Sequence, residues 1–368
     1  TPFNNVKGSE KPLYDHLLVS LHHTRKNLGP HGLPLIGRAD WNDCLNLNCF
    51  SAVDGESFQT VENNDTHVAE SVFIAGRFVK YGKEFADLAN HVRKEKDGEE
   101  VLKAVEDIER ATIKYGFDYE GGYFIRAYDA YSHEVGSTKC EEGKIFIEPQ
   151  GFCTRAGIGK ELGLGKKALD ASFQYLLDDF GLEIVYPPYS SYHIELGEIS
   201  SYPQGVKENG AVFNHNNPWV VLACCEEKEP ERAFDLYKRN APSFIEEHSE
   251  IHRTEPYVYS QRIAGRSSKS YGQAKNSWLS GSATWSFVAL SEGILGIQPE
   301  FDGLRVNPCL PKELGKVHVH RIFRNHTYEI DRENAGLGKC EIVVDGEKTE
   351  DNLIPIKDEE IIRVNIRL

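Results

Sequence analysis

The densest group of reactive and polar side chains lies in the segment 37–47, which contains Arg38, Asp40, Trp41 and Asp43 among several amides. A sugar ring stacks its apolar face on an indole, and its hydroxyl groups bond to carboxylates, amides and guanidinium groups. A carboxylic acid packed against such an apolar face can stay protonated at neutral pH and donate to a glycosidic oxygen. The segment therefore predicts a sugar site with an acid. The alternative is that the two Asp residues cap a following helix and that Trp41 belongs to the core.

A second polar group lies in the loop 205–218, directly before the apolar run 219–225. It brings together Lys207, Glu208 and His215 with several asparagines. A loop of this composition forms either a wall of a binding site or an elaborate helix start. A single histidine such as His215 is more often a hydrogen-bonded structural residue. No HExxH or comparable ligand spacing occurs, so we expect no metal site.

A third group precedes a helix expected over 283–295. Ser280 and Gly281 would present backbone N–H groups and a hydroxyl at the positive end of that helix, which favours an anion. The alternative is ordinary capping of the helix by serine. The segment 255–261, which ends at Gln261, adds another cluster of aromatic and amide side chains. An acidic protein with one anion site and three aromatic, polar loops suggests a neutral sugar and phosphate as ligands.

Apolar residues at helical spacing predict five helices around these loops, over residues 12–28, 68–92, 101–115, 166–180 and 283–295. The long connections between them are too aromatic to be disordered, which favours a functional role. After about residue 303, four short runs have strand composition and Asp345-Gly346 is a hairpin signal. We therefore predict a mainly α domain over residues 1–302 and a small antiparallel β domain over 303–368.

Composition excludes several classes of function. Lys and Arg number 42 against 57 Asp and Glu, a net charge of −15, which argues against nucleic acid and anionic membranes as partners. No apolar run reaches the roughly 18 residues of a spanning helix, and no nucleotide-binding glycine motif occurs. The eight cysteines form no CxxC pair, which favours reduced thiols in a cytoplasmic protein. The chain starts at Thr1 and contains no Met, so we expect a segment to be missing upstream.

Five segments together resemble the cellobiose phosphorylases, the inverting disaccharide phosphorylases of glycoside hydrolase family 94. The matching segments are 32–47, 55–60, 144–151, 206–219 and 276–281. Chitobiose phosphorylases share the Trp-Asn-Asp core but follow it with a shorter, Gly-rich loop. The insert 48–51 therefore resembles the cellobiose branch.

The resemblance implies the later part of an (α/α)6 barrel, followed by a jelly-roll-like C-terminal β domain. It also implies a homodimer for the full-length form, with no cofactor and with phosphate as a substrate. The chain departs from the family at Ser280, where threonine is usual, and at Arg155 and Arg262, where an apolar residue such as Met is expected.

The resemblance also implies a role for each site residue. Asp43 would be the single general acid, because phosphate replaces the water that a hydrolase must activate. The other residues would form three binding sites. The sugar would be bound by Arg38, Asp40 and Trp41, the acceptor glucose by Lys207, Glu208 and Gln261, and phosphate by His215, Ser280 and Gly281.

Two other classes of function stay open. An inverting hydrolase would need a second carboxylate as base, for which Glu70 and Glu208 are candidates. A non-catalytic sugar-binding or structural fragment is the other. Cellobiose, longer cellodextrins and an N-acetylated disaccharide are not distinguished.

Overall fold

The computed structural model describes residues 2–54, 68–278, 281–334, 336, 340–356 and 359–368. Its helices are α1 (Leu13–Lys26), α2 (Val72–His91), α3 (Glu95–Tyr115), α4 (Ile147–Arg155), α5 (Leu164–Tyr175), α6 (Asn217–Glu226), α7 (Pro230–Asn240), α8 (Ser249–His252) and α9 (Ser282–Val288). A π-helical turn, Ala289–Ile294, continues α9. None of the described helices is long and apolar enough to cross a membrane.

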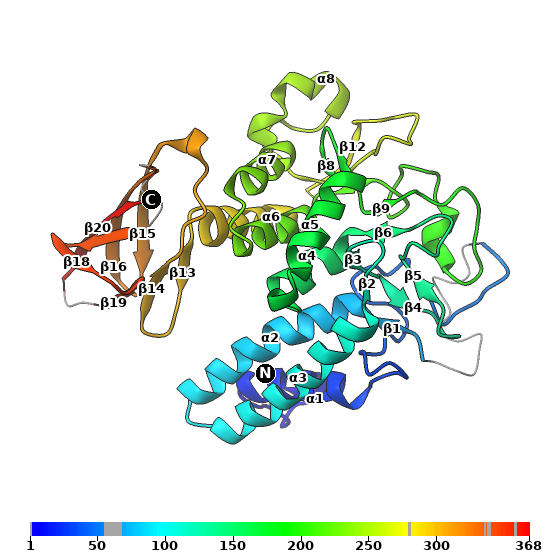
Figure 1. The fold of residues 1–368 in the computed structure, drawn as a ribbon, viewed down its shortest axis with the longest axis horizontal. Helices are drawn as coiled ribbons and strands as arrows, with labels where there is room; N and C mark the ends of the chain where they lie inside the picture. Colours follow the sequence, from blue (N-terminus) through cyan, green and yellow to red (C-terminus); the bar gives the residue numbers. More distant parts are fainter. Residues whose placement is uncertain (1, 55–67, 279–280, 335, 337–339, 357–358) are drawn as a thin grey trace.

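The helices form two layers (Figure 1). In the inner layer, α4 packs between α2 and α6, and α6 also contacts the π-helical turn. In the outer layer, α3 packs on α2, α5 on α4 and α7 on α6, while α1 lies against α2 and α3. Glycines permit two of these close approaches: a Cβ at Gly76 would lie 2.9 Å from the backbone of Cys153, and one at Gly151 would lie 3.0 Å from the Trp219 side chain.

All five predicted helices are present, and α4, α6, α7 and the short α8 are additional. Every residue of α4 from Ile147 to Thr154 is buried, as is every residue of α6 from Asn217 to Cys225. A helix that is covered on all sides has no polar face, so its sequence shows no amphipathic period. At the end of α4, the Arg155 guanidinium carbon lies over the rings of Phe152 and Trp285, 5.0 and 5.4 Å from their centroids.

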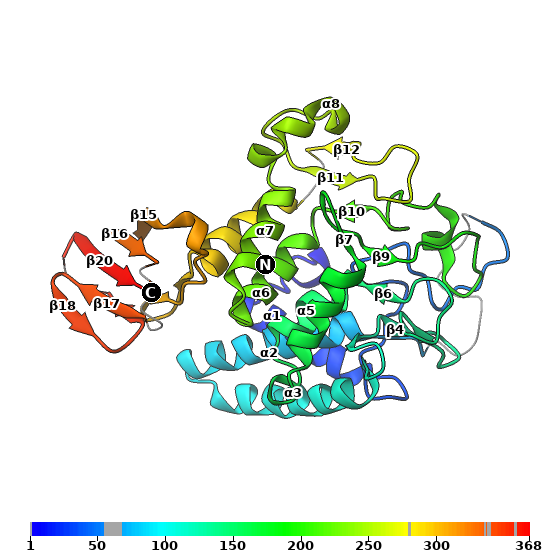
Figure 2. The same cartoon turned by 45° about the horizontal axis from the view of Figure 1, so that its top comes forward.

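The connections between the helices carry short strands, which Figure 2 shows clustered at one end of the helical layers. They are β1 (Glu70–Ser71), β2 (Phe117–Asp118), β3 (Tyr123–Phe124), β4 (Ala127–Tyr128), β5 (Glu134–Val135), β6 (Ile145–Phe146), β7 (Leu177–Asp178), β8 (Gly181–Leu182), β9 (Val185–Tyr186), β10 (Val212–Phe213), β11 (Ser260–Ile263) and β12 (Ala274–Ser277). All of their pairings are antiparallel, and the longest strands form the sheet β10-β11-β12. Much of the described part of these connections therefore consists of small antiparallel sheets.

The C-terminal part consists of two sheets (Figure 1). One joins β13 (Ile297–Pro299), β14 (Gly303–Val306) and β19 (Leu353–Pro355). The other has the order β15-β16-β20-β17-β18, with β15 (Lys316–Phe323), β16 (His326–Glu333), β17 (Glu341–Val344), β18 (Glu347–Thr349) and β20 (Ile361–Arg367). The two-residue turn at Asp345-Gly346 joins β17 to β18, as predicted, with φ angles of 51° and 90°.

The prediction of a wholly antiparallel β domain is wrong at one pair. Strands β16 and β20 run parallel, with Tyr328 opposite Ile362 and Ile330 opposite Val364. A parallel pair needs a long crossover rather than a hairpin. The chain from Asn334 to Glu360, which carries β17, β18 and β19, supplies that connection.

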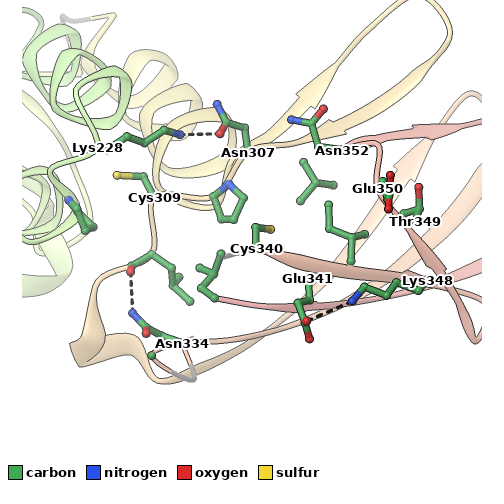
Figure 3. Close-up of a pocket in the computed structure, with 17 residues that line it drawn as sticks. Lys228, Asn307, Cys309, Asn334, Cys340, Glu341, Lys348, Thr349, Glu350 and Asn352 are labelled. Carbon is green, nitrogen blue, oxygen red and sulfur yellow. Dashed lines mark hydrogen bonds and ion pairs between the residues drawn. The ribbon is translucent and has the colours of Figure 1, made fainter. Parts of the chain in front are cut away.

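A cavity of about 880 Å³ lies where the helices meet the β sheets (Figure 3). Its walls include Lys228, whose ammonium donates to Asn307 Oδ1 at 2.6 Å, and the thiols of Cys309 and Cys340. None of the predicted site residues lines it.

Candidate functional site

The predicted site residues gather at the amino ends of the inner helices. The loop 37–47 leads toward α2, His215 directly precedes the start of α6, and Gly281 directly precedes α9. Glu148 lies in the first turn of α4. Inner-layer helices that point the same way bring segments far apart in sequence to one end of the molecule.

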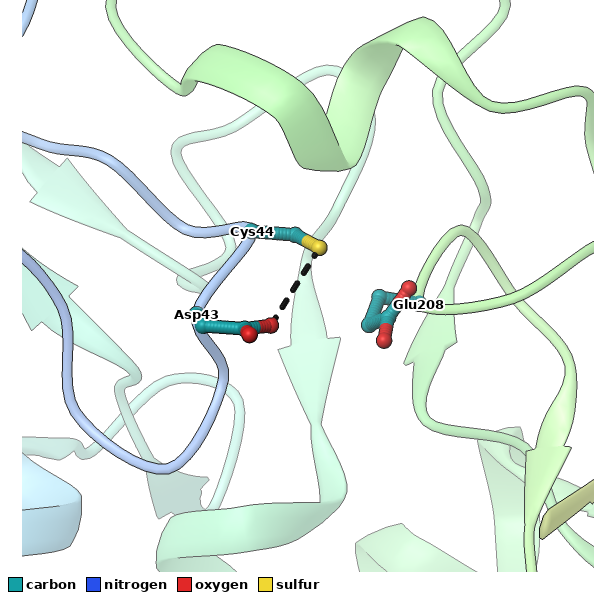
Figure 4. Close-up of side chains that lie close together, drawn as sticks. All are labelled: Asp43, Cys44 and Glu208. Carbon is teal, nitrogen blue, oxygen red and sulfur yellow. Dashed lines mark hydrogen bonds between the residues drawn. The ribbon is translucent and has the colours of Figure 1, made fainter. Parts of the chain in front are cut away.

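Asp43 and Glu208 face each other across the site (Figure 4). Asp43 is exposed, and the Cys44 thiol donates to its Oδ1 at 3.5 Å. One oxygen of Asp43, one oxygen of Glu208 and the Cys44 sulfur all lie within 4.8 Å of one another. Burial raises the pKa of Glu208, and the neighbouring charge of Asp43 adds to the shift while Lys207 opposes it. The arrangement is therefore a pair of carboxyls in which burial favours the neutral form of one member.

Among the described residues, the ligand atoms of Asp43, Cys44 and Glu208 lie close enough together to hold a cation. Burial raises the pKa of the Cys44 thiol far above its usual range, and the charge of Glu208 raises it further. A thiol binds metals as the thiolate, so Cys44 is a poor ligand at neutral pH. The donor set does not fit a resident metal.

Asp40 is buried, and its carboxylate is fully engaged. Arg126 donates to both of its oxygens at 2.7 Å, and the Ser71 hydroxyl donates to Oδ2 at 2.7 Å. Burial alone would raise the pKa of Asp40, but Arg126 and Ser71 hold it below its ordinary value. On the other side of the guanidinium, Glu148 lies 3.5 Å away, and burial raises its pKa. Asp40 thus anchors the loop, and its neighbour Trp41 is half-buried and packs against the core.

Trp41 lies between the acid and the predicted phosphate residues. Its ring centroid is 5.5 Å from those of His215 and Trp219 and 5.6 Å from that of Phe213. A Cβ on Gly281 would lie 2.8 Å from His215 Cε1, so the imidazole packs directly on this glycine. Burial lowers the pKa of His215, and the charge of Arg77 lowers it further, so the ring is neutral at pH 7. Ser280 lies outside the described residues.

The residues predicted to bind the acceptor sugar lie in different parts of the site region. Lys207 donates to the Tyr202 hydroxyl at 3.2 Å, beside Glu208. Gln261 accepts a hydrogen bond from Asn276 at 2.7 Å in an exposed part of the sheet. Arg38 is exposed in the turn that precedes Asp40. The structure therefore brings Glu208 to Asp43, with Lys207 beside Glu208, and no such contact with Asp43 is seen for Arg38 or Gln261 among the described residues.

The helix-capping alternative for the first loop is wrong in the described part of the chain. Residues 41–50 form turns, and the helix that follows, α2, is capped by Ser71, whose hydroxyl accepts from the Ile74 N–H at 3.0 Å. The N-cap residues of α6 and α9, Asn216 and Gly281, make no side-chain capping hydrogen bond. The alternative of serine capping at α9 is not tested, because Ser280 lies outside the described residues.

Two residues of the site carry no signal in the sequence. Arg77 lies on α2 and, with Asp40 and Trp41, lines a cavity of about 460 Å³ between α1 and α2. Tyr202 links Lys207 to the Cys44 thiol, 3.5 Å from its hydroxyl. Arg77 belongs to an ordinary amphipathic helix, and Tyr202 is one of many tyrosines in a long loop, so only the fold reveals them.

Indoles, carboxyls and a histidine beside glycine are gathered at one end of the packed helices, and these groups have the chemistry to bind a sugar. The model of the glycosyl hydrolase 94 superfamily, catalytic domain, matches residues 1–296. The chain belongs to this superfamily, which confirms the resemblance to glycoside hydrolase family 94, while the assignment to the cellobiose branch stays a prediction.

Relatives of this chain include disaccharide phosphorylases. N,N'-diacetylchitobiose phosphorylase of Vibrio proteolyticus is 31% identical over 329 residues, which are 89% of this chain and 38% of that protein. Solabiose phosphorylase of Paenibacillus borealis is 27% identical over 348 residues, 94% of this chain and 43% of the relative. The chain thus spans about two fifths of the length of these relatives.

Solved structures show the same fold at low identity. A structure named sialidase matches with a TM-score of 0.59 and 11% identity, covering 86% of this chain and 27% of the other. This likeness concerns the fold alone.

Proposed function

We propose that the full-length protein that carries this chain phosphorolyses a β-1,4-linked disaccharide, converting cellobiose and phosphate to α-glucose 1-phosphate and glucose. The observation that carries the proposal is the placement of Asp43. It is an exposed carboxyl next to Trp41 and faces Glu208, in a chain of the glycosyl hydrolase 94 superfamily. His215 lies against the same indole and packs on Gly281.

In the proposed reaction, a phosphate oxygen attacks the anomeric carbon from the face opposite the glycosidic bond. That bond breaks, and Asp43 gives its proton to the leaving oxygen of the acceptor sugar. The phosphate loses a proton on forming the ester, which restores the acid. One substitution at the anomeric carbon inverts its configuration, so a β-linked sugar yields the α-phosphate.

The separation of the carboxyls argues against Asp43 and Glu208 as the acid and base of an inverting hydrolase. An inverting hydrolase places its acid and base about 6.5–9.5 Å apart to leave room for a water. The closest oxygens of Asp43 and Glu208 lie within 4.8 Å. The other candidate base, Glu70, is buried and accepts from the backbone N–H groups of His31 and Leu33 at 3.0 and 3.1 Å.

The architecture proposed from the family is consistent with the two helical layers. We propose that the pairs α2/α3, α4/α5 and α6/α7 are successive units of an (α/α)6 barrel, with the site at the amino ends of the inner helices. The C-terminal sheets would be a jelly-roll-like domain. A homodimer and a cytoplasmic location for the full-length form remain predictions.

The test is sugar release from cellobiose by the full-length protein, with and without phosphate. We expect α-glucose 1-phosphate and glucose in equal amounts, and no release without phosphate. Glucose release independent of phosphate would show a hydrolase, and binding without turnover would show a non-catalytic protein.

A further inference from the structure

Two thiols meet where α6 ends against the segment that leads into the C-terminal sheets. Cys225 lies in the last turn of α6, Cys309 lies between β14 and β15, and a hydrogen bond links their side chains. The Cys309 N–H donates to the Ile294 carbonyl at 3.0 Å. A Cβ on Gly293 would lie 3.1 Å from the Cys225 sulfur. Both cysteines therefore lie against the end of the same π-helical turn, which places the two thiols side by side.

Cys309 has the surroundings of a nucleophilic thiol. It lines the cavity of about 880 Å³, together with Lys228. The hydrogen bond with Cys225 lowers the pKa of Cys309 and the charge of Lys228 lowers it further, although burial opposes both effects. The same hydrogen bond and burial raise the pKa of Cys225. Since the thiolate is the form that attacks a disulfide, Cys309 is suited to react first and Cys225 second.

The cavity has the size and the lining for a small peptide. Protein pockets that hold small molecules have volumes of about 300–1,000 Å³. The wall carries ammonium groups, carboxylates and side-chain amides, which pair with the carboxylates, ammonium groups and amides of a peptide. These lining residues are Lys228, Lys348, Glu341, Glu350, Asn307, Asn334 and Asn352.

The direction of the side chains favours Cys225 as the partner of Cys309. In Figure 3, the Cys309 side chain lies beside Lys228 and points toward the helices. Cys340, the other thiol of this cavity, lies on the strand side and is exposed.

We propose that Cys309 and Cys225 form a disulfide by exchange with a low-molecular-weight peptide disulfide that enters this cavity. The Cys309 thiolate attacks one sulfur of the reagent, whose S–S bond breaks, and a mixed disulfide forms. The Cys225 sulfur then attacks Cys309 and displaces the second half of the reagent. The two protons of the protein thiols pass to the two thiolates that leave. Two protein thiols are thus oxidised to one disulfide, and the reagent is reduced to two thiols.

The disulfide would connect the carboxyl end of α6 to the segment that leads into β15. The amino end of α6 lies at the candidate site, at the other end of the helix. The inference therefore concerns a modification site outside the proposed catalytic machinery.

The experiment treats the reduced full-length protein with glutathione disulfide and maps its cysteines by peptide mass spectrometry. In the parent protein, we expect a link between Cys225 and Cys309 that dithiothreitol reverses. Cys225→Ser should accumulate a glutathione adduct at Cys309, because the second step is blocked. In Cys309→Ser, Cys225 should stay reduced. A link between other cysteines, or no link, would overturn the inference.

The role of Lys228 tests whether the thiol reacts in the folded protein. In the Cys225→Ser protein, Lys228→Gln should slow adduct formation at Cys309 about three- to tenfold, because less of the thiol is ionised. An unchanged rate would show that Cys309 reacts only after local unfolding, and would overturn the inference.

Cys340→Ser is the matched control, because it removes the exposed thiol from the strand side of the same cavity. We expect the link between Cys225 and Cys309 to form at the parent rate in this variant. Loss of the link in Cys340→Ser would show that Cys340 passes the oxidation on, and would overturn the assignment of Cys309 as the thiol that reacts first.

Discussion

Asp40 and Asp43 are three positions apart and occupy opposite environments. Asp40 is buried and paired with Arg126 through two hydrogen bonds, whereas Asp43 is exposed beside Glu208. Two carboxyls with different surroundings can take different roles. The structure therefore favours Asp43 as the proton donor and Asp40 as the residue that fixes the loop.

Asp43→Asn should separate catalysis from folding. It removes the proton donor and keeps size and polarity, so phosphorolysis should fall by about 10²–10⁴-fold while the thermal midpoint stays near the parent value. In Asp40→Asn, the buried Arg126 keeps one acceptor oxygen at position 40 but loses the second oxygen and the negative charge. We expect this loss to lower the free energy of unfolding by about 3–5 kcal/mol. The checks are kinetics and thermal unfolding of both variants. Near-normal phosphorolysis in folded Asp43→Asn would disprove the assignment.

His215 tests the proposed phosphate site. The neutral ring can donate one hydrogen bond to phosphate, so His215→Ala should raise the KM for phosphate about tenfold or more. His215→Gln keeps a neutral donor and should lose less. Gly281→Ala should resemble His215→Ala, because the new Cβ would displace the imidazole from 2.8 Å. The measurement is the KM for phosphate in phosphorolysis. If this KM is the same in all three variants as in the parent protein, phosphate binds elsewhere.

The inner helices owe their stability to burial rather than to helix-start signals. Apart from Ser71 at α2, no described inner helix has a side-chain cap. Their amino ends are instead occupied by the polar site. A binding site built on helix ends thus removes the capping residues by which such helices are usually recognised.

Strand β16 carries a second buried arginine, Arg332, which has no side-chain partner in the part of the chain that the structure describes. Arg332 is 2% exposed, and its Nε, Nη1 and Nη2 have no hydrogen-bond partner among the described residues. Burial lowers its pKa to about 10. It pairs with Ile366 on β20, so it lies on the apolar face of the sheet.

Arg332→Met should stabilise the protein, because it replaces an unpaired buried charge by an apolar side chain of similar length. We expect a gain of about 1–4 kcal/mol in the free energy of unfolding. The measurement is denaturant unfolding of the parent and the variant. The control is Arg363→Met on β20, an exposed position where the change should stay within about 0.5 kcal/mol. A loss of stability in Arg332→Met would show that the guanidinium has a partner in solution.

At the scale of the whole molecule, buried carboxyls couple folding to pH. The net charge is −15, and two acids of the loop region have strongly raised pKa values through burial, about 6 for Asp178 and about 7 for Glu183. Glu183 is 1% exposed, accepts from the Arg266 N–H at 2.7 Å and pairs with its Nε at 2.9 Å. Glu183, which lies between β8 and β9, thereby connects these strands to the loop that follows β11.

Glu183→Gln should change the pH dependence of stability. The folded protein holds the proton of Glu183 up to about pH 7, whereas the unfolded chain releases it near its ordinary value of 4.5. The folded state binds more protons in this window, so the free energy of unfolding falls as the pH rises from 4.5 through 7. The variant lacks this contribution, about 3 kcal/mol at 1.36 kcal/mol per pKa unit. Unfolding curves at pH 5 and pH 8 measure it, and an identical pH dependence in both proteins would contradict the prediction.

The residue types of the site and several helices with one polar face could be predicted from the sequence, although α7, which also has one polar face, was not predicted. The motif around Trp41 and Asp43 indicated a sugar site and an acid, and the amphipathic spacing predicted α1, α2, α3 and α5. These features are local, because a run of a few turns or a short loop contains the whole signal. The hairpin at Asp345-Gly346 was predictable for the same reason.

Long-range packing sets which polar residue is buried and which one faces the site. Asp40 differs from Asp43 because Arg126, far along the chain, reaches it, and Glu208 meets Asp43 because α2 and α6 flank α4. Helices α4 and α6, covered on every side, left no periodic pattern, and the parallel pairing of β20 depended on a long crossover. A sequence pattern records the contrast between buried and exposed faces of one element, and long-range partners are set by how the elements pack.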